Sequence, residues 1–272
     1  MQIDIFQAII LGAVQGVTEF LPISSRAHLI LIPWLLGWPD PGLTFDVALH
    51  LGTLAALLIY FRKDWIYLTM SAFRLLEGDT ENPDARLALF IILATIPGGI
   101  AGLLFEQMAE EISTPTVIAT TLIVLALLLR AAELSGQRKT DLETMTLSDA
   151  LMIGLAQTLA IIPGVSRSGV TITAGLFRGM TRKAAAQYSF LLSAPIIGGA
   201  VAKKLIDIAA EGLPPGQGLP FAVGIIVSAF FGFISIAALM RYLQTRSTFV
   251  FIHYRIALGI VVLILGYFWG LH

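Results

Sequence analysis

Six long runs of apolar residues recur along this chain, separated by shorter segments in which polar and charged residues gather. An apolar run of about 20 residues gives a helix that can cross the roughly 30 Å hydrocarbon core of a bilayer. The runs cover residues 43–61, 86–105, 115–132, 183–204, 219–241 and 254–271. This pattern predicts six transmembrane helices.

Two further apolar regions contain prolines that interrupt them. Residues 5–36 are expected to break at Leu21-Pro22 and again near Pro33, and residues 149–180 at Pro163-Gly164. Irregular backbone is tolerated at membrane depth only inside protein or along a cavity, so we expect two re-entrant helical hairpins. An ordinary kinked span is the alternative for each region.

The two halves of the chain are weakly similar. A shift of 142 residues places Gly12 on Gly154, Gln15 on Gln157 and Ser24 on Ser166. Each half consists of one hairpin and three spans, and this odd number of spans inverts the second half relative to the first. The predicted fold is therefore an all-α integral membrane protein. It is a single polytopic domain over residues 1–272, with inverted repeats at approximately 5–133 and 149–271.

Composition supports a membrane protein and excludes several kinds of chemistry. Only 13% of the 272 residues are charged, and the mean hydropathy is +0.85. A net charge of −1 gives no sign of nucleic-acid binding. The absence of cysteine excludes disulfides, thiolate metal sites and cysteine nucleophiles.

Basic residues gather on one predicted side of the membrane, which the positive-inside rule makes cytoplasmic. Thirteen of the 17 lie there: Arg62, Lys63, Arg74, Arg86, Arg130, Arg138, Lys139, Arg178, Arg182, Lys183, Arg241, Arg246 and Arg255. The first hairpin is then expected to enter from outside and the second from the cytoplasm. In this topology Tyr254 and Arg255 are expected near the cytoplasmic side, away from an outward-facing site.

Polar side chains interrupt the first hairpin over residues 15–28, which read QGVTEFLPISSRAH. Ionisable groups within apolar sequence are costly and for that reason are usually functional. Gln15 and Glu19 are four residues apart and share one helix face. This pair suits a hard cation such as Mg²⁺ or Ca²⁺, and Glu19 is equally a candidate general base. A hydrogen-bonded polar pair between helices is the structural alternative.

The serines that follow Pro22 are typical of the start of a helix. Free backbone N–H groups beside Ser24 and Ser25 attract anions, phosphate in particular. His28 lies one turn after Ser25 on the same face, so the two side chains are candidates for nucleophile and base. Alternatively, the imidazole itself takes a phosphoryl group, or the serine is a plain N-cap beside an interfacial histidine.

The second hairpin repeats this arrangement in residues 157–169, QTLAIIPGVSRSG. Ser166 and Ser168 flank Arg167, whose guanidinium binds phosphate bidentately and stays charged when desolvated. A structural ion pair, for example with Glu19, is the alternative. If the hairpins meet, these groups suit transfer or hydrolysis of a phosphoryl group, and the membrane location indicates a substrate with a lipid tail.

Asp46 and His50 lie four residues apart in the first span. We expect these two side chains to pair with each other, although both are also placed to line the same cavity.

Together, the motifs at residues 15–28 and 163–169 resemble those of the bacterial undecaprenyl-diphosphate phosphatases, the bacitracin-resistance protein family. The resemblance covers essentially the whole chain in length and span pattern. It implies an enzyme of the bacterial cytoplasmic membrane that removes the terminal phosphate of undecaprenyl diphosphate, with its active site facing outward. Such enzymes need a divalent cation and recycle the lipid carrier of cell-wall synthesis.

The resemblance also implies roles for residues of this chain. Gln15 and Glu19 match the element associated with metal and catalysis, and Ser25 and His28 match the residues proposed as nucleophile or acid and base. Arg167, with Ser166 and Ser168, matches the pyrophosphate-binding loop, and Ser24 lies at the equivalent bend of the first hairpin. Some members have Glu in place of Gln15. Arg26 stands where others have a small or hydroxyl residue, and it adds a positive charge beside the phosphate site. The attacking group stays open between Ser25, His28 and water.

A second class of function is a polyprenyl-phosphate transporter or flippase that uses the same residues to bind a headgroup, because inverted repeats with broken helices are typical of transporters. Transport of a lipid would not require the group formed by Glu19, Ser25 and His28. A structural membrane scaffold leaves Glu19 and Arg167 unexplained. We expect a lipid diphosphate and membrane lipids as partners, and the sequence leaves the choice between monomer and homodimer open.

Overall fold

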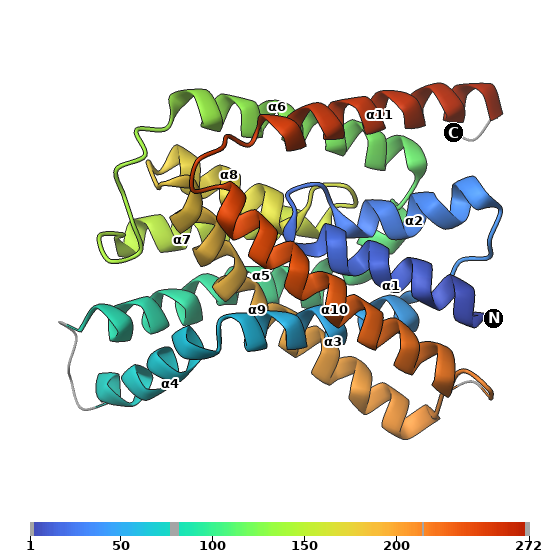
Figure 1. Ribbon diagram of the computed structural model, residues 1–272, viewed down its shortest axis with the longest axis horizontal. Helices are drawn as coiled ribbons and strands as arrows, with labels where there is room; N and C mark the ends of the chain where they lie inside the picture. The colour runs from blue at the N-terminus through green and yellow to red at the C-terminus, as the bar shows by residue number, and fades with distance from the viewer. Residues whose placement is uncertain (1–2, 77–81, 214, 270–272) are drawn as a thin grey trace.

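The computed structural model describes residues 3–76, 82–213 and 215–269. Within them the chain is all-helical apart from turns and one isolated bridge between Thr140 and Met180. The helices, labelled in Figure 1, are α1 (Ile5–Phe20), α2 (Ser25–Leu36), α3 (Leu43–Tyr60), α4 (Arg62–Leu76), α5 (Pro83–Glu111), α6 (Pro115–Ser135), α7 (Leu147–Gln157), the 3₁₀ helix η1 (Thr158–Ile161), α8 (Arg167–Phe177), α9 (Arg182–Glu211), α10 (Gly218–Tyr242) and α11 (Phe249–Trp269).

Six helices are long and apolar enough to cross a membrane, namely α3, α5, α6, α9, α10 and α11. They correspond to the six predicted spans, so the prediction of an all-α, multi-pass membrane protein is confirmed. Residues 270 and 271, at the end of the last predicted span and repeat, lie outside the described residues. The amphipathic helix α4 was not predicted.

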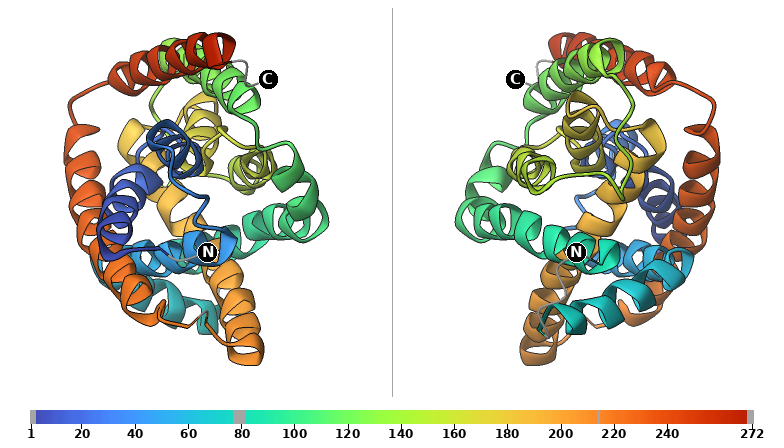
Figure 2. Two further views of the ribbon diagram at one scale, coloured as in Figure 1. Left: turned by 90° about the vertical axis from the view of Figure 1, so that its right-hand side faces the viewer. Right: turned by 90° about the vertical axis from the view of Figure 1, so that its left-hand side faces the viewer.

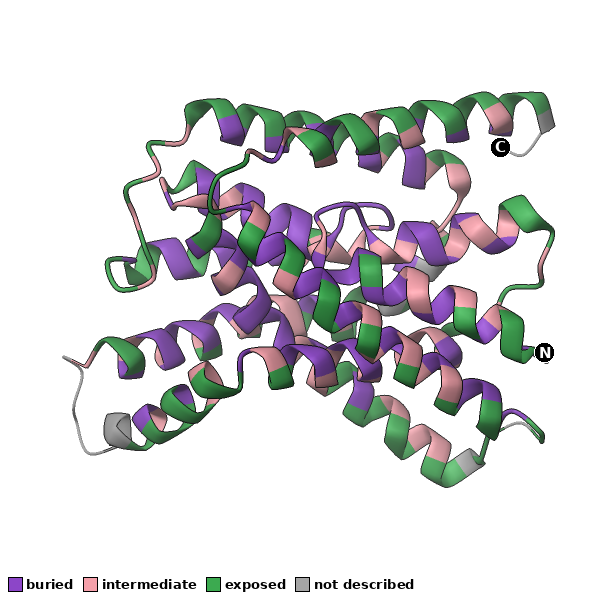
Figure 3. Cartoon of the chain, viewed as in Figure 1, coloured by how far each residue is buried: buried purple, intermediate pink, exposed green. Residues whose placement is uncertain are grey.

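The remaining apolar segments form two helical hairpins that enter the molecule from opposite ends. In Figure 1, the hairpin α1–α2 opens toward the right and the hairpin α7–η1–α8 toward the left. Their bends, at residues 22–24 and 163–166, are buried in the interior (Figure 3). These paths fit the expected re-entrant hairpins and inverted repeat.

One predicted break does not occur. Helix α2 continues through Pro33 to Leu36 and ends at Gly37, whose φ of 65° places it in the left-handed region. A proline removes one N–H and disturbs one carbonyl of the preceding turn, and a helix can continue past it where the surroundings accept that carbonyl. The glycine, rather than the proline, therefore ends this helix.

Small residues let α1 of the first hairpin and its neighbour α10 approach each other closely. A Cβ on Gly16 of α1 would lie 2.6 Å from the carbonyl oxygen of Ser228 on α10, so only glycine fits there. The Ser228 hydroxyl in turn donates to the Leu49 carbonyl of α3 at 2.8 Å. Close backbone contact of this kind is how helices associate in lipid, where apolar burial supplies little drive. Helix α10 thus fixes α1 and α3 relative to each other.

Helices α6 and α11 pack along each other on one side of the hairpins (Figures 1 and 2). At one end of this pair, buried Glu133 of α6 accepts hydrogen bonds from Arg182 Nε at 2.9 Å and Thr248 Oγ1 at 2.9 Å. This charged cluster ties α6 to α9 and to the segment before α11. All of its hydrogen bonds join parts of the chain, which marks it as structural.

Candidate active site

The bend of the first hairpin follows from its local sequence. Leu21, which precedes Pro22, is extended with ψ 140°, as a residue before proline prefers, and α1 ends there. Ser24 then adopts a positive φ of 74°, and its hydroxyl accepts a hydrogen bond from the Ala27 N–H at 3.3 Å. Helix α2 therefore begins at a buried bend with its first N–H groups facing the interior.

The second bend has the same construction. Gly164 has a φ of 86°, and Ser166, with a φ of 71°, caps α8 by accepting from the Gly169 N–H at 3.1 Å. Among the described residues only Ser24, Ser166 and Arg138 are non-glycine residues with positive φ. Such backbone costs about 1–3 kcal/mol and often occurs at functional sites, so the matched pair of serines singles out both bends.

The two bends meet inside the protein. The Ser168 hydroxyl of α8 lies 3.1 Å from the Leu21 carbonyl and 3.3 Å from the Glu19 carbonyl, at the end of α1. The N-termini of α2 and α8 therefore lie beside the same carboxylate, and two helix ends that attract anions serve one location.

Glu19 is the centre of this location. Its Oε2 accepts from Ser25 Oγ at 2.5 Å and from Gln15 Nε2 at 3.0 Å, and it lies 3.4 Å from His50 Nε2. Its Oε1 is 4.0 Å from Arg167 Nη1. With only 9% of its surface exposed, Glu19 is held by four side chains from α1, α2, α3 and α8. The structure thus brings predicted residues of both hairpins together.

His28 makes hydrogen bonds away from Ser25. Its Nδ1 is 2.7 Å from the Ser24 carbonyl, which only accepts, so Nδ1 carries a proton. Its Nε2 is 2.6 Å from the hydroxyl of Tyr254, and the two rings stack with 5.7 Å between centroids. The Ser25 hydroxyl instead donates to Glu19.

The remaining predicted substrate-binding residues differ in their placement. Ser24, Ser166 and Ser168 line the two bends, and the Ser166 and Ser168 hydroxyls are 3.2 Å apart. Arg26 turns toward the connection between α5 and α6, where its Nη2 donates to Ser113 Oγ at 3.4 Å. Its charge is therefore at the margin of the site.

The expectation that Asp46 and His50 pair with each other is wrong. His50 Nδ1 lies 2.7 Å from the backbone carbonyl of Asp46, and the other ring nitrogen faces Glu19. Within the described part of the chain, Asp46 Oδ1 has no hydrogen-bond partner. The close packing of α1 and α3 on α10 brings His50 to the carboxylate, and this long-range contact is not encoded in the spacing of four residues.

The expectation that Tyr254 and Arg255 lie away from the site is also wrong. Tyr254 contacts His28, and Arg255 Nη1 donates to the Pro22 carbonyl at 3.1 Å. Both residues lie within the second turn of α11, deep enough in the protein to reach the bends. The available signal was the apolar stretch 249–252 before Arg255, which lets the helix begin earlier than the predicted span of 254–271 and places the arginine deeper than the membrane edge.

Two polar atoms at the site are buried and have no hydrogen-bond partner among the described residues, namely Gln15 Oε1 and Arg167 Nη1. The first is an oxygen beside a carboxylate, which suits a hard cation, and the second is a donor for a phosphate oxygen. No group of three or more His, Asp or Glu with metal-binding geometry occurs in the described segments. Gln15 Oε1 and the Glu19 carboxylate are the groups that would hold a hard cation such as Mg²⁺ or Ca²⁺ here.

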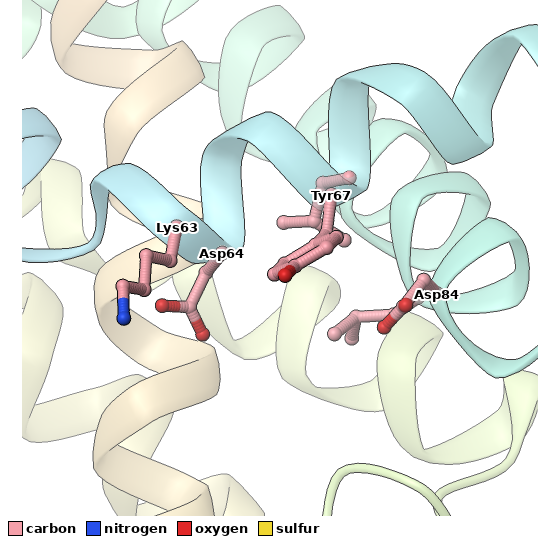
Figure 4. Close-up of a pocket in the computed structure, with 6 residues that line it drawn as sticks. Lys63, Asp64, Tyr67 and Asp84 are labelled. Atoms are coloured by element: carbon pink, nitrogen blue, oxygen red, sulfur yellow. The ribbon is translucent and has the colours of Figure 1, made fainter.

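A separate cavity of about 190 Å³ lies between α4 and α5, at the far end of the molecule from α2. Figure 4 shows Lys63, Asp64, Tyr67 and Asp84 on its walls. The Asp64 carboxylate already accepts a hydrogen bond from Gln187 at 2.9 Å. None of the residues that line the two bends belongs to this cavity.

Comparison with known proteins gives consistent matches over almost the whole chain. Residues 8–261 match the sequence model of the family described as bacitracin resistance protein BacA. Three similar curated proteins carry the name undecaprenyl-diphosphatase. The one from Geotalea daltonii is 52% identical over 264 residues, covering 96% of this chain and 98% of the relative. Those from Pelobacter propionicus and Moorella thermoacetica are each 49% identical, covering 94% and 97% of this chain and 95% and 98% of the relatives.

Proposed function

The chain belongs to the bacitracin resistance protein BacA family, and we propose that it hydrolyses undecaprenyl diphosphate to undecaprenyl phosphate and inorganic phosphate. The relatives' shared name at about half identity supports a phosphatase over a flippase. The single structural observation that carries the proposal is the Ser25 hydroxyl at 2.5 Å from a buried carboxylate, with Arg167 beside it.

Ser25 is the nucleophile in this proposal, and Glu19 is its base. As the Ser25 oxygen attacks the terminal phosphorus, its proton passes to Glu19 Oε2, which already accepts its hydrogen bond. The bond from phosphorus to the bridging oxygen breaks, and undecaprenyl phosphate leaves with the electron pair. Because the Nε2 of His28 is taken up by Tyr254, the geometry favours Ser25 over His28.

Water completes the reaction. Glu19 releases its proton to solvent, accepts a proton from the attacking water, and returns it to the Ser25 oxygen as inorganic phosphate leaves. One water is consumed and one proton is released in each turnover. Arg167 and the N-termini of α2 and α8 stabilise the negative charge that develops on the phosphoryl oxygens.

A divalent cation bound by Gln15 and Glu19 would supply further charge neutralisation at the diphosphate. The free Gln15 Oε1 supports this placement. The partners of the protein are then a polyprenyl diphosphate and the surrounding lipids.

The distribution of basic residues supports a site that faces outward. By the positive-inside rule, the end of the molecule that holds Arg138 and Arg182 is cytoplasmic. The first hairpin then opens to the outer face of the bacterial cytoplasmic membrane, where the lipid carrier of cell-wall synthesis is regenerated.

Phosphate release by the purified protein in detergent tests the proposal. Undecaprenyl or farnesyl diphosphate is supplied with Mg²⁺ or Ca²⁺, with and without chelator, beside Glu19→Ala. We expect cation-dependent release that the variant loses. No release by folded wild-type protein under any cation would overturn the proposed function.

A further inference from the structure

Arg255 is the largest fully buried side chain among the described residues, with 1% of its surface exposed. It lies in α11, outside both motifs of the hairpins. A guanidinium cannot lose its charge in a protein, and burying it is costly unless its donors are satisfied. The hydrogen-bond partners of its N–H groups therefore indicate what the buried guanidinium does in the fold.

All the hydrogen bonds of Arg255 go to backbone carbonyls, and those carbonyls belong to three separate segments. Nη1 donates to Pro22 at the first bend, at 3.1 Å. Nη2 donates to Gly164 and Val165 at the second bend, at 3.0 and 3.1 Å. Nε donates to Leu122 of α6, also at 3.1 Å. One planar group thus joins both bends and anchors them to the pair α6–α11.

The first turn of α8 is shaped to admit this guanidinium. A Cβ on Gly169 would lie 2.8 Å from Arg255 Nη1, closer than a real Cβ approaches another heavy atom. The equivalent position of the first hairpin holds Ala27, which caps against Ser24 in the same way. The glycine is therefore required by the arginine behind it and not by the helix cap.

Other side chains of the pair α6–α11 hold the same region. Thr121 of α6 donates to the Pro163 carbonyl at 2.6 Å, and Tyr254 of α11 bonds His28 at 2.6 Å. Each of these contacts reaches one hairpin. Of these three side chains only Arg255 bonds both hairpins, so it adds to the direct contact of Ser168 with the end of α1 a rigid planar link between the two bends.

We propose that Arg255 is a positioning residue for the phosphatase reaction, which sets the separation between the first hairpin, with Glu19 and Ser25, and the second, with Arg167. This inference rests on the proposed function. The reacting groups stand on different hairpins, and a displacement of about 1 Å in such an arrangement costs roughly 100-fold in rate. Each hairpin keeps its own helix N-terminus without Arg255, so the phosphates still bind. Loss of Arg255 is therefore expected to lower kcat more than it raises KM.

The kinetic test compares wild type, Arg255→Met and Arg255→Lys on farnesyl diphosphate. The matched control is Arg130→Met, the same change at an exposed arginine of α6. We expect Arg255→Met to lower kcat about 100-fold or more with KM changed less than about tenfold. Arg255→Lys should restore little, because an ammonium lacks the planar fork, and the control should match wild type. A wild-type kcat in Arg255→Met would overturn the proposal.

A distance measurement tests the same claim without activity. The chain has no cysteine, so Val17→Cys and Leu159→Cys, exposed positions on the two hairpins, accept one spin label each. We expect a narrow distance distribution in the otherwise wild-type protein and a broader or shifted one with Arg255→Met. An unchanged distribution would refute the positioning role. An inactive wild type would refute the proposed function, and the distances would still test the role of Arg255 as a clamp.

Gly169→Ala keeps the test decisive if Arg255→Met does not fold. It leaves the charge in place and moves the guanidinium by pressing a methyl group against Nη1. We expect it to lower kcat with little change in KM and to broaden the label distance. Wild-type kinetics and distances in Gly169→Ala would overturn the proposal.

Discussion

At the first bend Ser24 caps α2 with a φ of 74°, and at the second Ser166 caps α8 with a φ of 71°. The residues that follow differ, because Ser25 occupies the place held by Arg167 in the other hairpin. Glu19 likewise corresponds to Ile161 under the same shift of 142 residues. The same capped bend therefore presents different reactive side chains in the two hairpins. In the proposed mechanism, the first hairpin supplies the nucleophile Ser25 and the base Glu19, and the second supplies the guanidinium of Arg167, which faces Glu19.

If the two hairpins divide the roles in this way, replacing the carboxylate of Glu19 should lower kcat more than any other single change. Glu19→Gln keeps the size and the polarity of the side chain but cannot accept the Ser25 proton. General-base catalysis contributes about 10²–10⁴ in rate, so we expect kcat to fall by about 10³. Phosphate release from farnesyl diphosphate measures it, and the exposed Glu143→Gln is the matched control. Retention of more than a tenth of the rate would break the assignment of the base to the first hairpin.

Replacing Arg167 of the second hairpin is expected to give the next largest loss of activity. Arg167→Lys keeps one charge but loses the bidentate geometry, so we expect kcat/KM to fall by about 100-fold, with part of the loss in KM. Lys at the exposed Arg130 is the control. A loss confined to kcat, with KM unchanged, would show that Arg167 does not bind the ground-state diphosphate.

His50 tests the comparison between the hairpins in a second way, because its ring faces Glu19 of the first hairpin. It lies 3.4 Å from Glu19 Oε2. Hydrogen bonds to charged groups are worth about 1.5–3 kcal/mol, so His50→Leu should lower kcat by about 10- to 100-fold. His50→Gln, which retains a donor, should lose less. Equal rates in the two variants would contradict a donor role.

The capping serines test whether the bends are equivalent. Ser24→Ala and Ser166→Ala remove a cap, and we expect each to lower the free energy of unfolding by about 1 kcal/mol. The glycine variants should cost less, because glycine accepts the positive φ. Unfolding in mixed micelles measures both pairs. Losses that differ several-fold between the two serines would show that the bends are not equivalent structures.

Much of the fold follows from the sequence because the membrane imposes simple rules. Apolar runs of sufficient length became α3, α5, α6, α9, α10 and α11, and the prolines at 22 and 163 mark both bends. Proline alone was an unreliable signal, since α2 continues through Pro33. Helix α4 lacked the long apolar run on which the prediction relied.

The candidate site was predictable for the residues of the two similar polar motifs, which the structure brings together at Glu19 and Arg167, and not for residues outside them. Glu19 and Ser25 lie six residues apart, and their hydrogen bond follows from the bend between them. The contacts of His50 with Glu19 and of Tyr254 with His28 join distant segments. They depend on how α3 packs on α10 and how deeply α11 sits, which local pattern does not encode.

The central claim is that the two hairpins form one phosphatase site. Rates of phosphate release from undecaprenyl diphosphate by wild type, Glu19→Gln, Arg167→Lys and the double variant test it most directly. Groups that act in one transition state are strongly non-additive. We therefore predict that the double variant loses far less than the product of the two single losses. Full activity in either single variant, or losses that multiply, would contradict a shared site.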